Sequence, residues 1–410
     1  MKKRGKKWAI VLIIIIFVAC FYGKFDVQLG FIPNYVYADN NEEEESLEEA
    51  LEEEVDKQLS NLDFDTIESI LTNLTVNAKQ LFASESFVEK VTSVISGEYA
   101  ENSESFFSAI MSFFWSGLKD FLPIIASIIA ISILGGMIGN LKPTNNGKSI
   151  GNIVHFVTYG VIIVFLGTTL TQIISTTTTT LTTIKGLFDG IFPILMTMLT
   201  AVGGTVSVGI YQPAIALLSN AFISLITYLL LPLFIFSMVF SIVGNLSNNI
   251  RLDKFVSFLQ STFKWLIGLC FTIFLGFVSI QGVMAGAVDG LSIRTAKYAI
   301  KSYIPIVGGY VSDGFSVIMA SSMLIKNAVG GVGLFLLLST VISPVLNLVI
   351  FMLSLKFMAG IIEPIGDKKI ASFISDLSKS LTLLIALLIA VSFMYTILTG
   401  LVMCSANLVV

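Results

Sequence analysis

Side chains that commonly do chemistry are few in this chain and lie far apart. His155 is the single histidine, and the three cysteines, Cys20, Cys270 and Cys404, sit in separate apolar runs. A metal site or a disulfide framework needs several such residues at short, regular spacings. A lone histidine at the start of an apolar run is more typical of helix packing or of a membrane interface. We therefore expect no metal, no cofactor and no disulfide framework.

Motifs for nucleotide or nucleophilic chemistry are also missing. The full glycine loop that ends in Lys-Ser or Lys-Thr and cradles phosphates is absent, so any energy input must come from a partner or a gradient. The threonine run Thr176–Thr180 has no neighbouring base, and we expect it to form a polar turn or an external loop. The chain is not expected to be an enzyme.

The most unusual polar residues lie between apolar stretches in the second half of the chain. A cation in the middle of a bilayer costs about 2.5 to 3.5 kcal/mol on insertion scales, so such residues need a wet or a paired setting. Lys326 stands between Ile325 and the glycine pair Gly330-Gly331, which favours a cavity-lining or inter-helix role. Snorkelling at an interface is the alternative for Lys297. The candidates for a conduit or for helix packing are Lys326, Asp289, Arg294, Lys297, Asp313, Pro193, Pro305, Gly308 and Gly309.

Composition shows which elements must hold these residues. The 410 residues are 55% hydrophobic and 13% charged, with a mean hydropathy of +0.87, which leaves too little polar surface for a water-soluble globule. Apolar runs near 20 residues, the length that crosses a bilayer, predict an all-α, polytopic membrane protein. The predicted spans are Phe121–Leu141, Asn152–Ile174, Pro213–Leu246, Trp265–Met284, Leu334–Leu355 and Leu381–Met403.

Two further apolar stretches, Leu187–Val202 and Ile304–Leu324, carry Pro193 and Pro305 and are short or interrupted. We expect proline-broken segments there, either full spans or re-entrant hairpins. Matching tripeptides around Pro193 and Pro305, and around Pro232 and Pro344, have the same offset of 112 residues. Together with two further matches, this offset predicts a duplicated helical unit, with repeats at about 152–264 and 264–380 of the membrane domain 120–410.

The N-terminal part predicts export. Lysines and an arginine precede the apolar run Ala9–Tyr22, and Val36-Tyr37-Ala38 offers a cleavage site, so residues 1–38 are a signal peptide or a retained signal anchor. Residues 39–119 then form a small extracytoplasmic helical region that is acidic and amphipathic. Its glutamate-rich start is either a solvated helix face or a docking face for a basic partner.

Basic residues set the expected sidedness. Lys148, Arg251 and Lys369 fall in three loops that the positive-inside rule places in the cytoplasm, so an even number of crossings separates them. Six full crossings satisfy this condition if the two doubtful stretches are re-entrant. The basic residues Arg294, Lys297 and Lys301 would then lie outside, against the rule.

A resemblance extends these predictions. The segment Val278–Gly282, continued through Asp289–Tyr298 to Ile304–Gly308, closely resembles the stage III sporulation protein AE family of endospore-forming bacteria. The stretch Thr200–Asn220 and the plan of signal, charged external region and polytopic remainder are similar as well. The glutamate-rich start and the long segment before the cleavage site depart from the family pattern.

The resemblance implies a membrane component of the assembly that joins mother cell and forespore, in the mother-cell membrane around the forespore. Implied partners are the other stage III A proteins, including a cytoplasmic ATPase, and the forespore stage II protein Q. The family brings no catalytic residues, and we expect the lipid bilayer but no nucleic acid as a further partner. A homo-oligomer is left open.

Two other classes of protein remain as alternatives. A secondary transporter or permease would also have internal repeats, interrupted helices and a few buried charges. A structural membrane scaffold would need none of its charges to be wet. Substrate-dependent flux in vesicles that contain this protein alone would favour the transporter, and assembly that survives removal of the charges would favour the scaffold.

Overall fold

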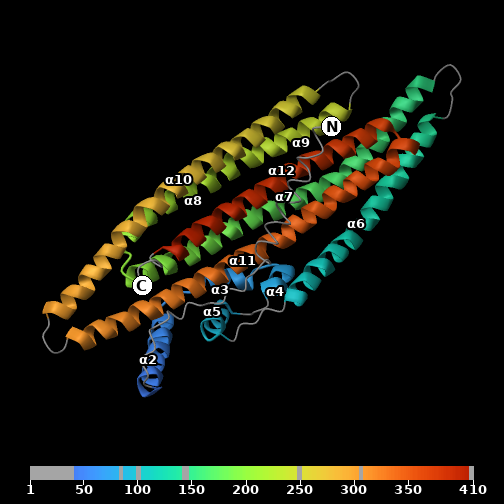
Figure 1. Ribbon diagram of the computed structural model, residues 1–410. Helices are drawn as coiled ribbons and strands as arrows, with labels where there is room; N and C mark the ends of the chain where they lie inside the picture. The colour runs from blue at the N-terminus through green and yellow to red at the C-terminus, as the bar shows by residue number, and fades with distance from the viewer. Residues whose placement is uncertain are drawn as a thin grey trace, which may run out of the picture. The chain divides into compact units, whose positions relative to one another are not determined.

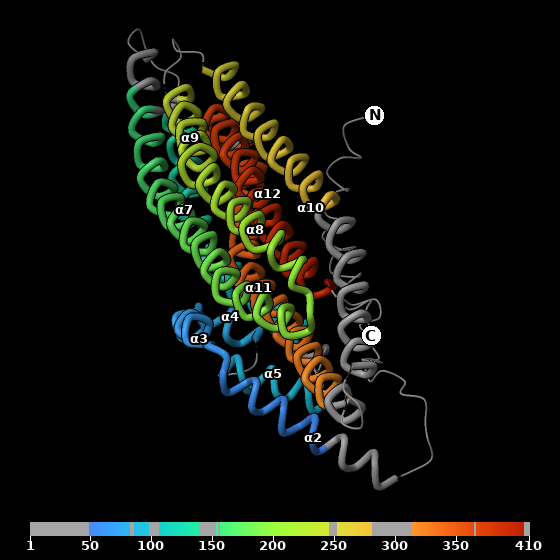
Figure 2. The backbone as a smooth tube through the Cα atoms, turned by 90° about the vertical axis from the view of Figure 1, so that its left-hand side faces the viewer, coloured from blue at the N-terminus to red at the C-terminus, as the bar shows by residue number. Residues whose placement is uncertain are grey.

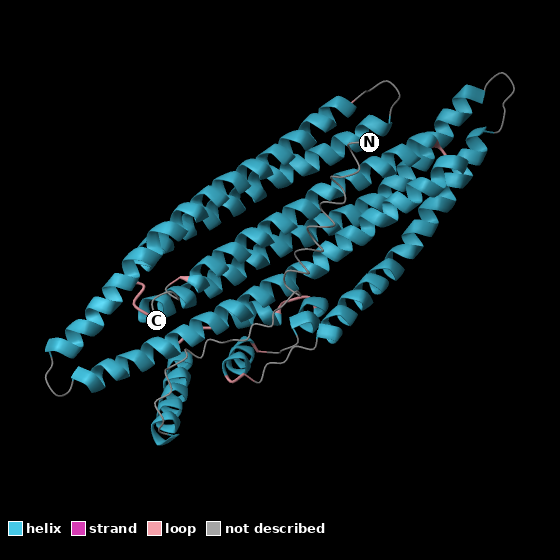
Figure 3. Ribbon diagram, in the orientation of Figure 1, coloured by secondary structure: helices cyan, strands magenta, loops and turns pink. Residues whose placement is uncertain are grey.

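The computed structural model describes residues 41–82, 86–97, 103–140, 147–246, 252–303 and 308–405, and every regular element in these ranges is a helix (Figure 3). The expected signal at residues 1–38 lies outside them. The chain divides into two units, Met1–Ala50 with Val410 and Leu51–Val409, and the contacts given below belong to the second unit.

Four short helices precede a bundle of long ones (Figure 1). The short helices are α2 (Asn41–Ser60), α3 (Asp65–Thr72), α4 (Val76–Phe82) and α5 (Phe87–Ile95). The long helices are α6 (Ser103–Asn140), α7 (Gly147–Ala201), α8 (Thr205–Leu225) continued through the π-helical η1 (Ile226–Leu230) into α9 (Leu231–Leu246), α10 (Asp253–Tyr303), α11 (Gly308–Ile365) and α12 (Lys368–Cys404).

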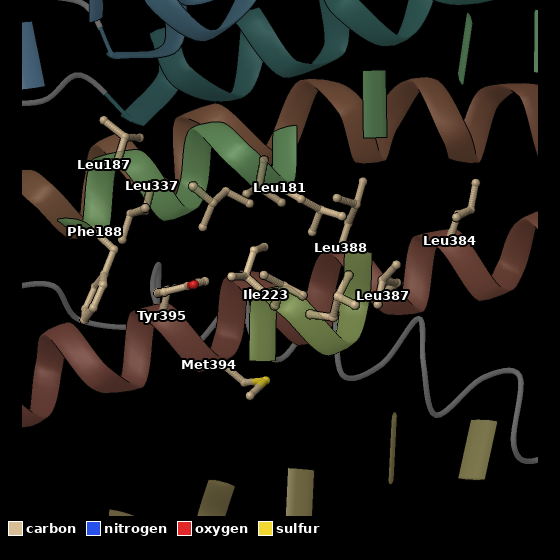
Figure 4. Packing of buried hydrophobic residues seen from close by; sticks show 14 of the residues in the cluster. Leu181, Leu187, Phe188, Ile223, Leu337, Leu384, Leu387, Leu388, Met394 and Tyr395 are labelled. Atoms are coloured by element: carbon tan, nitrogen blue, oxygen red, sulfur yellow. The ribbon is translucent and has the colours of Figure 1, made fainter. Parts of the chain in front are cut away.

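The bundle is built around α11 and α12. Helix α11 contacts α12, α7, α6 and α10, and α12 also contacts α7, α9 and α10 (Figures 1 and 2). Buried apolar side chains from α7, α8, α11 and α12 converge in one cluster, where Phe188 of α7 approaches Tyr395 of α12 with ring centroids 4.9 Å apart (Figure 4). The interior is therefore continuous between the first and the last long helices.

By their length and composition, six of the described helices or helix pairs are able to cross a membrane. They are Phe106–Ile138, Phe156–Ala201, Thr205–Asn245, Asp253–Ile280, Gly314–Pro364 and Lys368–Cys404. Each contains all or most of one of the six predicted spans, which confirms an all-α architecture with six helices of crossing length.

The interpretation of Leu187–Val202 as a re-entrant or proline-broken segment is wrong. Helix α7 continues without a break through Pro193 to Ala201, and the chain turns only at Gly203, whose φ of 93° suits glycine. The stretch is apolar because side chains such as Leu187, Phe188 and Ile191 are buried in the bundle. Of Ile304–Leu324, residues 304–307 lie outside the described ranges, and residues 308–324 begin α11 without a reversal.

The threonine run is also not a turn or a loop. Thr176–Thr180 lies inside α7, where hydroxyls bond to carbonyl groups one turn earlier: Thr177 donates to Ile173 (2.8 Å) and Thr180 to Thr176 (2.8 Å). Such bonds satisfy each hydroxyl within its own helix. The polar composition of this run therefore did not interrupt the helix.

The ends of several long helices meet at one end of the bundle. Tyr159, near the start of α7, donates a hydrogen bond to the carbonyl of Ile242 in α9 (2.8 Å) and lies against Phe373 near the start of α12 (ring centroids 5.0 Å apart). Gly136 of α6 lies so close to Gly366 that an added Cβ would be 2.8 Å from the Gly366 Cα. The last turns of α6, α9 and α11 and the first turns of α7, α10 and α12 thus share one end, called here the basic-loop end.

Helices α3 to α5 pack on the sides of α7 and α11. Ile67 and Ile70 of α3 lie against Gly190 and Gly186 of α7, where a Cβ would come within 2.9 and 3.0 Å of them. The carboxylate of Glu68 accepts hydrogen bonds from the amide of Phe87 (2.7 Å) and the hydroxyl of Ser86 (2.9 Å), which stabilises the N-terminus of α5. This layer is thus tied to itself and to the bundle.

Candidate functional site

Lys326 lies in the first half of α11 and is completely buried. Its ammonium group donates a hydrogen bond to the carbonyl of Ser405, the residue that follows α12. The last carbonyl groups of a helix have no partner within the helix and carry partial negative charge, so a cation there is stabilising. Lys326 therefore caps α12 from a neighbouring helix, and this contact supports the packing alternative for this residue.

The same point also joins α8. The hydroxyl of Ser405 donates to the Tyr211 hydroxyl (3.3 Å), and Tyr211 is 2% exposed. One residue after α12 thus connects side chains of α11 and α8. Breaking this polar contact would remove one hydrogen bond from each buried group, and that loss costs more in a buried site than at the surface.

A second polar contact lies nearby in sequence on α11. Gln58, near the end of α2, donates to the Ser321 hydroxyl (3.0 Å) and accepts from the Ser322 hydroxyl (2.8 Å), and both serines are buried. Elsewhere in the bundle, the hydroxyl groups of Tyr395 in α12 and Ser219 in α8 share a hydrogen bond of 3.0 Å. Buried polar side chains in this part of the chain therefore connect helices to one another.

Lys90 of α5 makes a third contact between the short helices and α11. It is 4% exposed, its ammonium group lies 4.4 Å from the ring centroids of both Phe82 and Phe335, and it donates to the Phe82 carbonyl. A desolvated cation between two rings is attracted to each of them. Phe106 of α6 also approaches Phe335, with ring centroids 5.9 Å apart. Phe335 thus joins α4, α5 and α6 to α11.

The other predicted site residues take the following places. Asp289, Arg294 and Lys297 lie in the later part of α10, Gly308, Gly309 and Asp313 in the first two turns of α11, and Pro193 on the exposed side of α7; Pro305 lies outside the described residues. Helix α10 runs unbroken from the basic-loop end, so Arg294, Lys297 and Lys301 belong to its opposite end. His155 lies in the third turn of α7. No group of three or more His, Cys, Asp or Glu side chains in the described ranges is arranged to hold a metal ion.

Sequence reasoning missed Lys90, Gln58 and Glu68. A signal for Lys90 exists, because it occupies the apolar face of α5 with Phe87, Val91 and Val94 at helical spacing. Gln58 gave no comparable signal, since its partners are about 260 residues away. Contacts of this kind depend on which helices become neighbours.

The fold and these contacts define a protein of the polytopic helical membrane class, in which a layer of short helices packs on the bundle. The chain belongs to the stage III sporulation protein AE family, whose model matches residues 85–406. It is 24% identical over 371 residues to the stage III sporulation protein AE of Bacillus subtilis (strain 168), covering 90% of this chain and 93% of that protein. No solved structure matches it. The family assigns the chain a role in sporulation.

Proposed function

We propose that this chain is a membrane component of a channel or secretion-like complex between mother cell and forespore, located in the mother-cell membrane that surrounds the forespore. One observation carries the proposal: six helices of crossing length form a bundle to which the layer α3–α5 is docked through Lys90, Phe82 and Phe335. One chain thereby offers partners two surfaces, the helices of crossing length and the layer α3–α5 that packs on them.

The two ends of the bundle fit different partners. The basic-loop end gathers three helix connections and would face a cytoplasmic ATPase of the stage III A group. Helices α3 to α5 lie towards the other end, where other stage III A proteins and the forespore stage II protein Q would bind. Under this proposal the chain itself hydrolyses no nucleotide, and the ATPase supplies the energy.

Cross-linking tests this arrangement in sporulating cells. Lys369 lies exposed in the first turn of α12 at the basic-loop end, and Lys57 lies exposed in α2. A photoreactive amino acid at Lys369 is expected to capture the ATPase, whereas the same group at Lys57 is expected to capture extracytoplasmic partners and no ATPase. Capture of the ATPase from Lys57, or from neither site, would contradict the proposal.

The alternatives make different predictions. A transporter would move substrate in vesicles that contain this protein alone, without the ATPase. The proposed channel component would give no such flux, and its loss would abolish late forespore gene expression. Reporter activity in the forespore, measured with and without an intact copy of the chain, separates these functions.

A further inference from the structure

The exposed face of α7 changes character abruptly. Between Ile153 and Phe165 every described exposed side chain is apolar, and Val157 and Val164 are 57% and 67% exposed. From Thr168 to Thr200 the exposed positions are polar, with Pro193 the single exception: Thr168, Thr171, Gln172, Ser175, Thr179, Thr182, Asp189, Thr197 and Thr200. An apolar helix face suits lipid and a polar one suits water. The surface of α7 therefore leaves the hydrocarbon near residue 166.

Helix α6 exposes two charged residues partway along the bundle. It runs antiparallel to α7, with Gly135 beside Thr158. Lys119 and Asp120 are exposed between the exposed apolar residues Phe107, Met111 and Trp115 on one side and Leu122, Leu134 and Met137 on the side of the basic-loop end. These two charges lie about 20 Å from the Gly135 contact, and the change on α7 lies about 12 Å from it, at about 1.5 Å per residue. Both helices place lipid next to the basic-loop end.

Helix α10, on another side of the bundle, shows a different pattern. Lys254 and Lys264 are exposed in its first part, together with Phe255 and Phe258, and the exposed apolar residues Trp265, Leu269, Ile273, Leu275 and Ile280 follow. Lysines and aromatic residues are typical of the membrane interface. On α10 the apolar surface therefore begins later and reaches farther from the basic-loop end.

Helix α12 lies between α7 and α10 and allows their heights to be compared (Figures 1 and 2). Its Tyr395 packs on Phe188 of α7, and its Phe393 stacks on Phe271 of α10. Phe188 and Phe271 thus lie at nearly the same height. There α7 exposes Thr182 and Asp189, whereas α10 exposes Leu269 and Ile273.

A bilayer perpendicular to the bundle cannot cover both apolar surfaces. From Ile153 to the height of Phe188 is 188 − 153 = 35 residues, or about 50 Å, whereas the hydrocarbon layer is roughly 30 Å thick. Helices that are longer than the layer is thick accommodate by tilting. In a tilted bundle, the hydrocarbon layer lies closer to the basic-loop end on the side of α6 and α7 and farther from that end on the side of α10.

We infer that the bundle crosses the bilayer obliquely, so that lipid covers α7 only up to about residue 166 but covers α10 at the height of Leu269. The part of α7 beyond Thr168, with the docked layer α3–α5 beside it, stands in water. The inference goes beyond the proposed function and holds or fails without it. It assigns the surfaces that bind lipid acyl chains.

Two pairs of positions at matched heights test it. Thr182 of α7 pairs with Leu269 of α10, and Val164 of α7 pairs with Ser257 of α10. The second pair is matched through α12. Gln260 of α10 bonds to Ser380 of α12, and Phe373, seven residues before Ser380, packs on Tyr159 of α7. Each position receives a cysteine with a nitroxide label in the full-length chain, with Cys20, Cys270 and Cys404 replaced by serine, reconstituted in phospholipid vesicles. Collisions with oxygen report lipid, and collisions with a water-soluble nickel chelate report water.

The logarithm of the oxygen-to-nickel collision ratio is expected to change sign within each pair. It should be positive at Val164 and Leu269 and negative at Thr182 and Ser257. Equal signs within each pair would show perpendicular insertion and overturn the inference. Low collision rates with both reagents at Leu269 would show that protein covers α10, which also overturns it. The same serine-substituted chain, labelled at a cysteine that replaces the buried Leu181, gives the low-collision reference.

Discussion

Two buried lysines show how this chain accommodates charge in an apolar bundle. Lys326 meets the end of α12, and Lys90 meets a carbonyl and the faces of two aromatic rings. In each case a backbone carbonyl group or π-electron density supplies negative charge near the ammonium group. An apolar replacement would therefore leave a helix end or a contact between layers without its partner.

Replacing Lys326 by leucine is expected to lower the stability of the protein by about 1–3 kcal/mol, because the Ser405 carbonyl loses a charged donor in a buried site. Lys326→Arg keeps a donor and should lose less. Thermal unfolding of the purified protein in detergent measures the change. Leucine at the exposed Lys356 of the same helix serves as the control.

Function can be followed in the same variants through forespore gene activation at matched membrane abundance. A cap alone predicts that activity follows abundance, and a conduit role predicts lost activity at normal abundance. An unchanged melting temperature for Lys326→Leu would contradict the capping role.

Replacing Lys90 by methionine is expected to loosen the docked layer by about 1–2 kcal/mol, since two cation–π contacts and a hydrogen bond are lost. Limited proteolysis of the intact protein should then cut faster between α3 and α5. Lys57→Met, at an exposed position of α2, should leave the cleavage rate unchanged. Equal protection in the Lys90 variant would show that other contacts hold the layer.

At the scale of helices, sequence predicted the crossings better than the stretches between them. All or most of each predicted span falls in a helix of crossing length. Leu187–Val202 was misread because apolar residues that face lipid and apolar residues that face protein have the same composition, and only the packed structure separates them. Pro193 adds to the wrong prediction, because a proline commonly breaks or kinks a helix, whereas here it lies on the exposed side of a continuous one.

Close helix packing at the basic-loop end can be tested with two glycines. Gly136→Ala would place a Cβ 2.8 Å from the backbone of Gly366, which cannot move aside like a side chain, so α6 should separate from the α11–α12 connection. Gly160→Ala, in an open position of α7, should be neutral or stabilising by about 0.5–1 kcal/mol. Melting temperatures of the two variants check this difference, and equal values would contradict the close contact.

On the scale of the whole molecule, the helix ends fit the predicted arrangement of crossings. Two helices of crossing length separate each basic connection from the next, and this holds without a re-entrant segment because Leu187–Val202 continues α7 and adds no further crossing. The duplicated unit at about 152–264 and 264–380 stays a prediction, because Pro305, half of its clearest match, lies outside the described residues. The docked layer could not be predicted, since its contacts join residues hundreds of positions apart.

Single cysteines at Lys148, Arg251 and Lys369 are expected to react only with membrane-permeant thiol reagents in intact mother cells, because the positive-inside rule places all three in the cytoplasm. Cysteine at the exposed Lys57 should react with impermeant reagents as well. Labelling of any of the first three from outside would refute the shared sidedness.

The contact of Phe82 and Lys90 with Phe335 also imposes an order on biosynthesis. Phe82 and Phe335 are 335 − 82 = 253 residues apart, which is about 13–50 s of translation at 5–20 residues per second. During that interval the apolar faces of α4 and α5 that pack on α11 stay uncovered, until α11 has been made. A chain that stops early never closes this surface, so proteases that reach it can distinguish unfinished copies from complete ones.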